Sequence, residues 1–97
     1  MSILDGLTGA IRRLLNPPIF AIELRDGPAI VRSGEPPAGL VAEFSSTARD
    51  LDLVRGTIYA RRAPHGLTID FSSDIPDSVR QRFRNVFGLY RQRIKAG

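Results

Sequence analysis

The chain has 97 residues, of which 42% are apolar and 25% are charged, and its formal net charge is +4. This length and composition are those of one ordinary globular domain, which excludes disordered and fibrous classes. The chain has no cysteine and a single histidine, which excludes disulfides and structural zinc sites of familiar ligand spacing. We expect no metal and no cofactor, and the lack of cysteine agrees with a cytoplasmic location.

Basic residues are concentrated in the second half of the chain. Residues 1–53 carry 5 Arg against 7 Asp and Glu, a net charge of −2, whereas residues 54–97 carry 9 Arg and Lys against 3 acidic residues, a net charge of +6. Of the 14 basic residues only Lys95 is lysine. The planar guanidinium suits carboxylate and phosphate groups. A GC-rich genome produces the same bias, and we favour this simpler explanation for the arginine content.

The first 16 residues predict an amphipathic helix that precedes a single domain at residues 17–97. Its apolar residues recur at helical spacing opposite Arg12 and Arg13, and the pair Pro17-Pro18 ends the pattern. These apolar residues are Ile3, Leu4, Leu7, Ile11, Leu14 and Leu15. They are expected to contact the domain itself, a second copy in a homodimer, or a membrane surface. A detached helix of this length is only marginally stable in water unless its apolar face is buried. The segment is shorter than the roughly 20 residues of a membrane span.

The segment after Pro18 predicts a hairpin followed by a helix. Residues 19–25 alternate in polarity, and Asp26-Gly27 favours a tight turn, so a return strand is expected at residues 29–32. A helix is expected to begin near Pro36-Pro37, because apolar residues from Leu40 to Leu51 then repeat at helical spacing.

The second half of the chain predicts the same order of elements. Residues 56–62 and 67–71 favour strands joined by a turn at residues 63–66. A last helix is expected after Ser73, Asp74 and Pro76, because these residue types are favoured at the start of a helix. Its apolar stripe of Val79, Phe83, Val86, Phe87, Tyr90 and Ile94 predicts a helix that runs almost to the C-terminus.

These elements predict an α+β fold of the order α-ββα-ββα, with a four-stranded, mainly antiparallel sheet and helices chiefly on one face. Weak matches between the two halves suggest an internal ββα repeat. The residues expected beneath the helices are Phe20, Ile22, Leu24, Ile58, Ile69 and Phe71. The mostly polar set expected on the opposite sheet face is Ala21, Glu23, Arg25, Thr57, Tyr59, Arg61, Thr68 and Asp70.

Three sequence stretches resemble a small bacterial family of unknown function. They are Arg25-Asp26-Gly27, Gly56-Thr57-Ile58-Tyr59, and Phe71-Ser72-Ser73-Asp74-Ile75-Pro76 followed by Gln81-Arg82-Phe83-Arg84-Asn85-Val86. The resemblance spans about residues 19 to 87. It implies a bacterial origin and a membrane-proximal role, and it implies neither an activity nor site residues. Members usually begin with a hydrophobic segment, where this chain has the shorter amphipathic one.

Basic residues of the third strand and the last helix form the candidate binding surface. They are Arg55, Arg61, Arg62, Arg80, Arg84, Arg91 and Lys95. Such a surface suits a phosphate backbone or an acidic protein. The alternative is that these side chains cover the rim of an ordinary buried helix stripe and keep their charges in water.

Catalysis is not expected. His65 is the only imidazole and lies in a Pro-His-Gly turn, and the sequence contains no Ser/His/Asp arrangement and no phosphate-binding glycine loop. Tyr59 is expected to pack against a neighbouring side chain rather than to stack on a base. We therefore expect a non-enzymatic binding or adaptor module for nucleic acid or an acidic protein. The alternatives are a peripheral membrane protein or a structural homodimer held by residues 1–16.

Overall fold

The computed structural model describes residues 17–53 and 55–94. The predicted helix of residues 1–16 and Lys95 lie outside the described residues. The described elements are β1 (Phe20–Arg25), β2 (Ala29–Ser33), α2 (Ala38–Asp50), β3 (Arg55–Ala63), β4 (Gly66–Phe71), α3 (Asp77–Tyr90) and the 3₁₀ turn η1 (Arg91–Arg93). The order ββα therefore occurs twice, and the predicted α+β class is confirmed.

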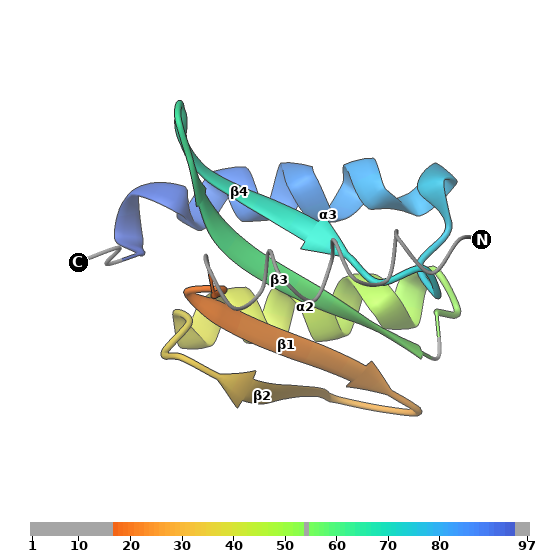
Figure 1. Cartoon of the computed structure of the whole chain (residues 1–97). Coiled ribbons are helices and arrows are strands. Elements are labelled where there is room, and N and C mark those ends of the chain that lie inside the picture. The colour runs from red at the N-terminus through yellow and green to blue at the C-terminus, as the bar shows by residue number, and fades with distance from the viewer. Residues whose placement is uncertain (1–16, 54, 95–97) are drawn as a thin grey trace.

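The four strands form one antiparallel sheet in the order β2-β1-β3-β4 (Figure 1). The two hairpins join through β1 and β3, in which Ile22 lies opposite Ile58. The centre of the sheet is thus built from one strand of each ββα unit. The strands β2 and β4 are its edges, and each pairs with a single neighbour in the described part of the chain.

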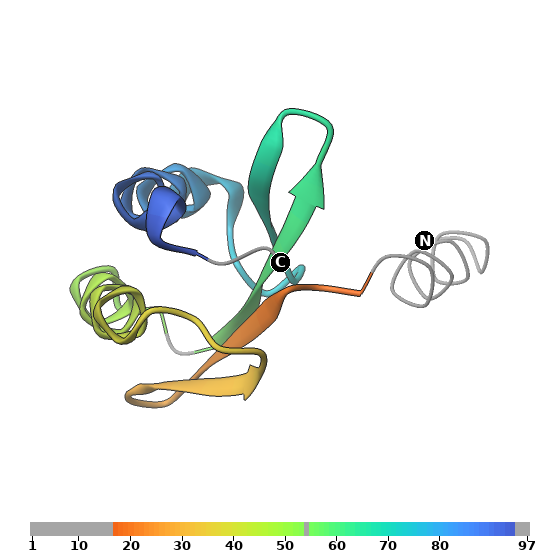
Figure 2. The same cartoon turned by 90° about the vertical axis from the view of Figure 1, so that its left-hand side faces the viewer.

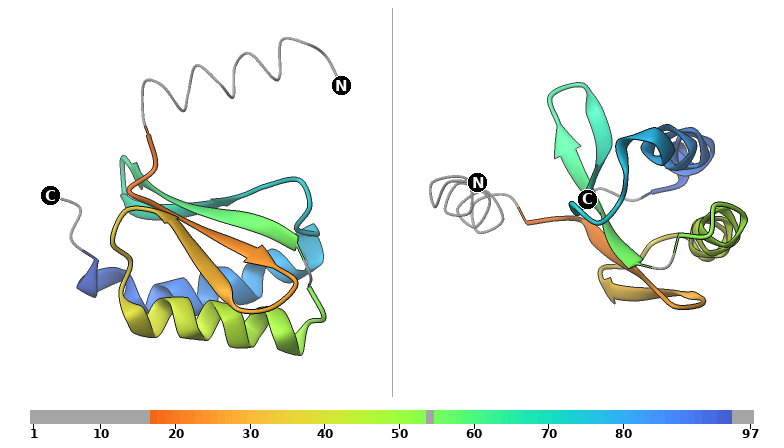
Figure 3. Two further views of the ribbon diagram at one scale, coloured as in Figure 1. Left: turned by 90° about the horizontal axis from the view of Figure 1, so that it is seen from below. Right: turned by 90° about the vertical axis from the view of Figure 1, so that its right-hand side faces the viewer.

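Both helices cover the same face of the sheet, side by side (Figures 2 and 3). Between them and the sheet lie the predicted core residues Phe20, Ile22, Leu24, Ile58 and Ile69, all buried, whereas Phe71 is half-buried. The helices meet through Phe44 of α2 and Phe83 of α3, whose rings pack edge to face with centroids 5.4 Å apart. The alternation of strand side chains thus decides which face is covered.

The last helix begins directly after the predicted start signals and changes to a 3₁₀ turn near its end. It begins at Asp77 after Pro76, and no side-chain cap bonds its first turn, so Ser73 and Asp74 are not caps. Its α-helical part ends at Tyr90 and continues as η1, after which Ile94 is extended. The helical backbone thus runs almost to the C-terminus, as predicted, but its last turn is 3₁₀ and Ile94, the last residue of the predicted stripe, lies just beyond it. Exposed Gly88 weakens the last turn, because glycine is a poor helix former.

Candidate functional site

Helix α3 carries its arginines on two flanks of a buried stripe. Phe83 and Phe87 are buried against the sheet and α2. At about 100° per residue, Arg80, Arg84 and Arg91 lie on one flank and Arg82 and Arg93 on the other. The first flank faces β4, because its side chains contact Phe71, Ile75 and the turn before β4.

Arg84 is an exposed arginine held over an aromatic ring. Its guanidinium carbon lies 5.3 Å from the centre of the Phe71 ring, which in turn packs against buried Phe83. Within residues 17–53 and 55–94, Arg84 has no ion pair. A cation–π contact of this kind uses none of the N–H donors of the guanidinium, which are left for other acceptors. Arg84 is therefore oriented by Phe71 and has donors to offer to an anion.

Arg80 lies beside Arg84 but has a structural role. Its guanidinium carbon is 5.4 Å from the Phe71 centroid, and Nε donates to the Ile75 carbonyl at 2.9 Å. A second, longer bond of 3.4 Å runs from Nη2 to the Ser72 carbonyl, and Nη1 pairs with Asp77 at 3.1 Å. These contacts hold the loop between β4 and α3, so few donors of this half-buried side chain are left for a partner.

Arg91 joins the end of α3 to the hairpin turn. Its Nη2 donates to the His65 carbonyl at 3.4 Å, at the long end of the hydrogen-bond range, and its side chain is exposed. Arg62 is exposed at the same end of the hairpin, where it lies opposite Leu67 in the register of β3 and β4. The structure thus brings Arg84, Arg91 and Arg62 to the border between α3 and β4.

Two predicted binding residues lie elsewhere. Arg55 begins β3 beside Arg25, seven residues before Arg62, and is therefore about 23 Å from that end of the strand. Arg61 is buried on the sheet face opposite the helices, with Nε 2.8 Å from Asp70 Oδ2 in an ion pair. Neither joins the surface beside β4. Lys95 and the predicted contact residues Ile3, Leu4, Leu7, Ile11, Leu14 and Leu15 lie outside the described residues.

Tyr59 contacts its neighbour Arg61, as the sequence predicts for a packed side chain. The Arg61 guanidinium carbon lies 5.6 Å from the centre of the half-buried Tyr59 ring. One face of the ring is thus occupied by a cation that is itself ion-paired. A base-stacking platform on this sheet face has no support from this arrangement.

One family matches this chain. Residues 8–97 match a family described as "Protein of unknown function (DUF3634)". The chain belongs to this family. The predicted resemblance to an uncharacterised family is thereby confirmed over a longer stretch than the sequence indicated. No curated protein and no solved structure matches the DUF3634 chain.

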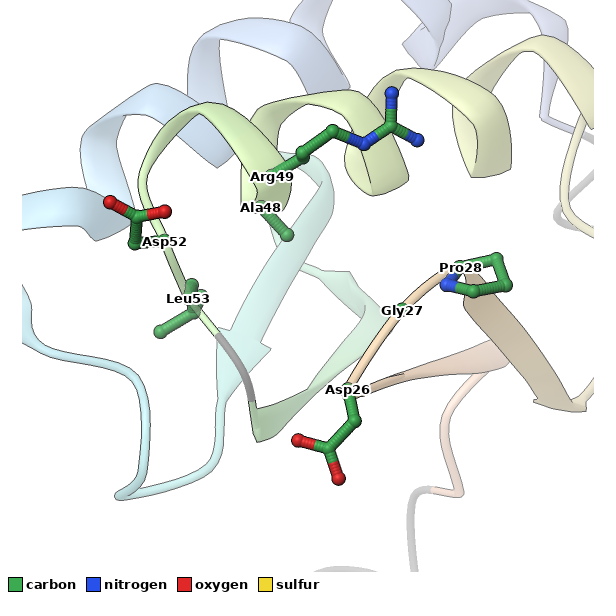
Figure 4. Close-up of a pocket in the computed structure, with 7 residues that line it drawn as sticks. All are labelled: Asp26, Gly27, Pro28, Ala48, Arg49, Asp52 and Leu53. Atoms are coloured by element: carbon green, nitrogen blue, oxygen red, sulfur yellow. The ribbon is translucent and has the colours of Figure 1, made fainter.

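The DUF3634 chain has a small pocket between the β1–β2 turn and the end of α2 (Figure 4), with a volume of about 240 Å³. Asp26 and Asp52 line it, both with positive φ, of 46° and 53°. Their carboxylates point in different directions in Figure 4 rather than toward a common centre. In the described ranges no three His, Cys, Asp or Glu residues gather as a metal site. The pocket therefore has no arrangement that indicates catalysis or metal binding.

A second hollow of the DUF3634 chain lies between β2 and α2, with a volume of about 470 Å³. Its lining includes Val31 and Val41 and is largely apolar. Neither this groove nor the cation–π contact of Arg84 with Phe71 was predicted from the sequence. The available signal for this contact was the spacing of Arg80 and Arg84 by one helical turn, behind a strand that ends in an aromatic residue.

No helix in the described ranges of the DUF3634 chain has the length and apolar character needed to cross a membrane.

Proposed function

We propose that this protein is a non-enzymatic binding module that holds an anionic partner against the surface formed by Arg84, Arg91 and Arg62 at the border of α3 and β4. The observation that carries the proposal is the cation–π contact of exposed Arg84 with Phe71, in which the guanidinium carbon lies 5.3 Å from the ring centre, together with the absence of an ion pair to Arg84 among the described residues. An arginine oriented in this way loses less side-chain entropy when it binds a carboxylate or a phosphate.

The electrostatic surroundings support the same proposal. Helix α3 and η1 carry Arg80, Arg82, Arg84, Arg91 and Arg93 against the single acid Asp77, which pairs with Arg80. Helix α2 beside them carries Glu43 and Asp50 against Arg49. The positive charge of the helix layer is therefore concentrated on α3 and η1, where it attracts an anion and steers it toward this side of the molecule.

Binding of two labelled anions to the full chain tests the proposal. The probes are a single-stranded DNA of about 20 nucleotides and poly-glutamate, measured by fluorescence anisotropy from about 50 to 200 mM salt. Arg84→Gln with Arg91→Gln is compared with Arg82→Gln plus Arg93→Gln, a matched control that removes the same two charges from the other flank of α3. Arg80 is left intact, because its loss would also disturb the loop that it holds.

The expected result is binding of at least one probe at low salt, with a larger loss of affinity in the Arg84/Arg91 variant than in the control. Loss of two phosphate contacts would also make the salt slope for this single-stranded DNA shallower by about 1.4. The proposal is overturned if neither probe binds at about 50 mM salt, or if the two variants weaken binding equally, since net charge alone would then explain the affinity.

A further inference from the structure

The edge of β4 presents three backbone positions whose hydrogen-bonding groups have no partner among residues 17–53 and 55–94. Ser72 donates its N–H to the Thr57 carbonyl at 2.9 Å, and Thr57 lies two residues before Tyr59, the partner of Asp70. Bonded pairs alternate along an antiparallel ladder, so residues 66, 68, 70 and 72 point their backbone groups at β3. The N–H and C=O groups of Leu67, Ile69 and Phe71 therefore point away from β3.

This edge runs beside the arginine flank of α3. Phe71 lies at one end of β4 under Arg84, and Gly66 lies at the other end beside Arg91, whose Nη2 would be 2.9 Å from a Cβ at Gly66. The side chains of Leu67, Ile69 and Phe71 face the helices, since Ile69 belongs to the core and side chains alternate across a strand. The arginines thus lie on the helix-covered side of the same sheet edge from which these backbone groups point outward.

We infer that the anionic partner is an extended acidic polypeptide that adds to the sheet as a strand beside β4, with every second side chain directed toward Arg84 and Arg91. The inference rests on the proposed function and adds the class of the partner. Backbone bonds to the edge would supply affinity, and the alternate side chains would supply specificity. Arg84 and Arg91 are seven residues apart, a rise of about 10.5 Å along the helix, whereas strand residues two or four positions apart are separated by about 6.7 or 13 Å, so flexible acidic side chains at such positions can reach both arginines. Successive carboxylates can therefore follow the arginine flank.

The residues on the opposite face of the sheet restrict where the partner can carry acidic side chains: only every second residue, the one directed toward α3, can be acidic. Asp70 and Thr68 lie on that face of β4, and both are exposed. An acidic side chain next to Asp70 is unfavourable, because it would meet a like charge and the neighbouring Arg61 is already paired with Asp70. The partner that fits therefore has acidic residues toward α3 and neutral or basic residues toward Asp70, rather than an unbroken acidic run.

The same surface suits a nucleic acid less well. Exposed aromatic rings on which bases could stack are not part of it, because the Phe71 ring is covered by Arg80 and Arg84. Asp74 and Asp77 are exposed in the segment that leads into α3, at the Phe71 end of the surface. They would repel a phosphate backbone, which carries a charge at every nucleotide, whereas a peptide can place neutral residues beside these two acids.

A peptide of about eight residues with alternating Glu and Thr provides the test, since strands of that length are common. The controls are a peptide of the same composition with its Glu residues in one block, and the alternating peptide with N-methyl groups on every second amide, which keeps the charge and removes strand donors. Hydrogen exchange followed by NMR on the full chain measures directly whether the backbone amides at the outer edge of β4 become protected. The variant Arg84→Gln/Arg91→Gln again removes the proposed binding arginines, and Arg82→Gln/Arg93→Gln is again the matched control.

The expected result is that the alternating peptide binds at least about tenfold more tightly than the blocked and methylated peptides. It should slow exchange of the Leu67, Ile69 and Phe71 amides, leave the Thr68 and Asp70 amides unchanged, and lose affinity in the Arg84/Arg91 variant alone. Binding of DNA or peptide without edge protection would overturn strand addition and leave the proposed function standing. Absence of binding by any anion would overturn both.

Discussion

Gly56 makes room for Ile75. A Cβ placed on Gly56 would stand 2.3 Å from Ile75 Cγ1 and 2.7 Å from Cδ1, and Ile75 is fully buried in the loop that leads into α3. Gly56 also has a φ of +148°, a conformation that side-chain-bearing residues rarely adopt. The start of β3 and the loop before α3 are therefore fitted to each other at this contact.

The change Gly56→Ala is expected to lower the free energy of unfolding by about 3 kcal/mol, because overpacking and backbone strain add at this position. Urea denaturation followed by circular dichroism measures the effect. Combining it with Ile75→Ala should give a loss smaller than the sum of the two single changes, since the clash would be absent. Strict additivity would show that the two residues do not compete for this space.

The change Gly88→Ala is the matched comparison on an exposed helix position. A Cβ at Gly88 would meet nothing within 4 Å, and Gly88 lies within the α-helical part of α3. Alanine is a better helix former than glycine by about 1 kcal/mol, so this variant should be more stable than the parent by roughly that amount. A loss of stability in the same urea experiment would mean that the end of α3 requires glycine for a reason other than helix propensity.

Local signals were sufficient to predict most of the fold. Asp26-Gly27 and the turn at residues 63–66 marked both hairpins, and alternation along β1 assigned Phe20, Ile22 and Leu24 to the covered face. The end of α3 could not be predicted this way. The apolar stripe continues to Ile94, but periodicity records which positions are apolar and not where the backbone leaves the helix.

The change Arg80→Lys is expected to lower stability by about 1 kcal/mol, because a lysine ammonium cannot replace the planar donors that reach the Ile75 and Ser72 carbonyls. The same substitution at Arg84 should change stability by less than about 0.5 kcal/mol, since Arg84 is exposed and bonds no loop carbonyl. Urea unfolding of the two variants measures the difference. Equal losses would contradict the assignment of Arg80 to structure and Arg84 to binding.

The candidate site shows why arginine content alone could not locate a surface. Arg61 and Arg62 are neighbours in sequence, yet alternation places Arg61 on the open sheet face beside Asp70 and Arg62 on the helix side. Arg80 and Arg84 are one helical turn apart, yet only Arg80 meets the loop carbonyls. Whether an arginine is already engaged in structural contacts depends on its neighbours in the folded protein. Arg80 is engaged by Ile75 in the loop before α3, and Arg61 is engaged by Asp70 on the neighbouring strand.

Asp52 lies in an unfavourable position at the end of α2. It follows the C-cap Leu51 with a φ of +53°, and the bonds from Leu53 N to the Ala48 carbonyl (2.9 Å) and from Asp52 N to the Arg49 carbonyl (3.2 Å) form a Schellman motif. Glycine is preferred at this position because it has no Cβ. A negative charge here also lies near the negative end of the helix dipole.

The change Asp52→Gly is therefore expected to raise the free energy of unfolding by about 1 kcal/mol, the combined gain from relieved backbone strain and from removal of the charge. Asp52→Asn separates the two causes: asparagine also tolerates a left-handed conformation, so its gain of about 0.5 kcal/mol would measure the charge alone. Urea denaturation at low and high salt measures both, and the gain of the Asn variant should shrink as salt screens the dipole. A decrease in stability for either variant would mean that the Asp52 carboxylate makes a favourable interaction at the pocket that it lines, which neither the dipole nor the backbone conformation accounts for.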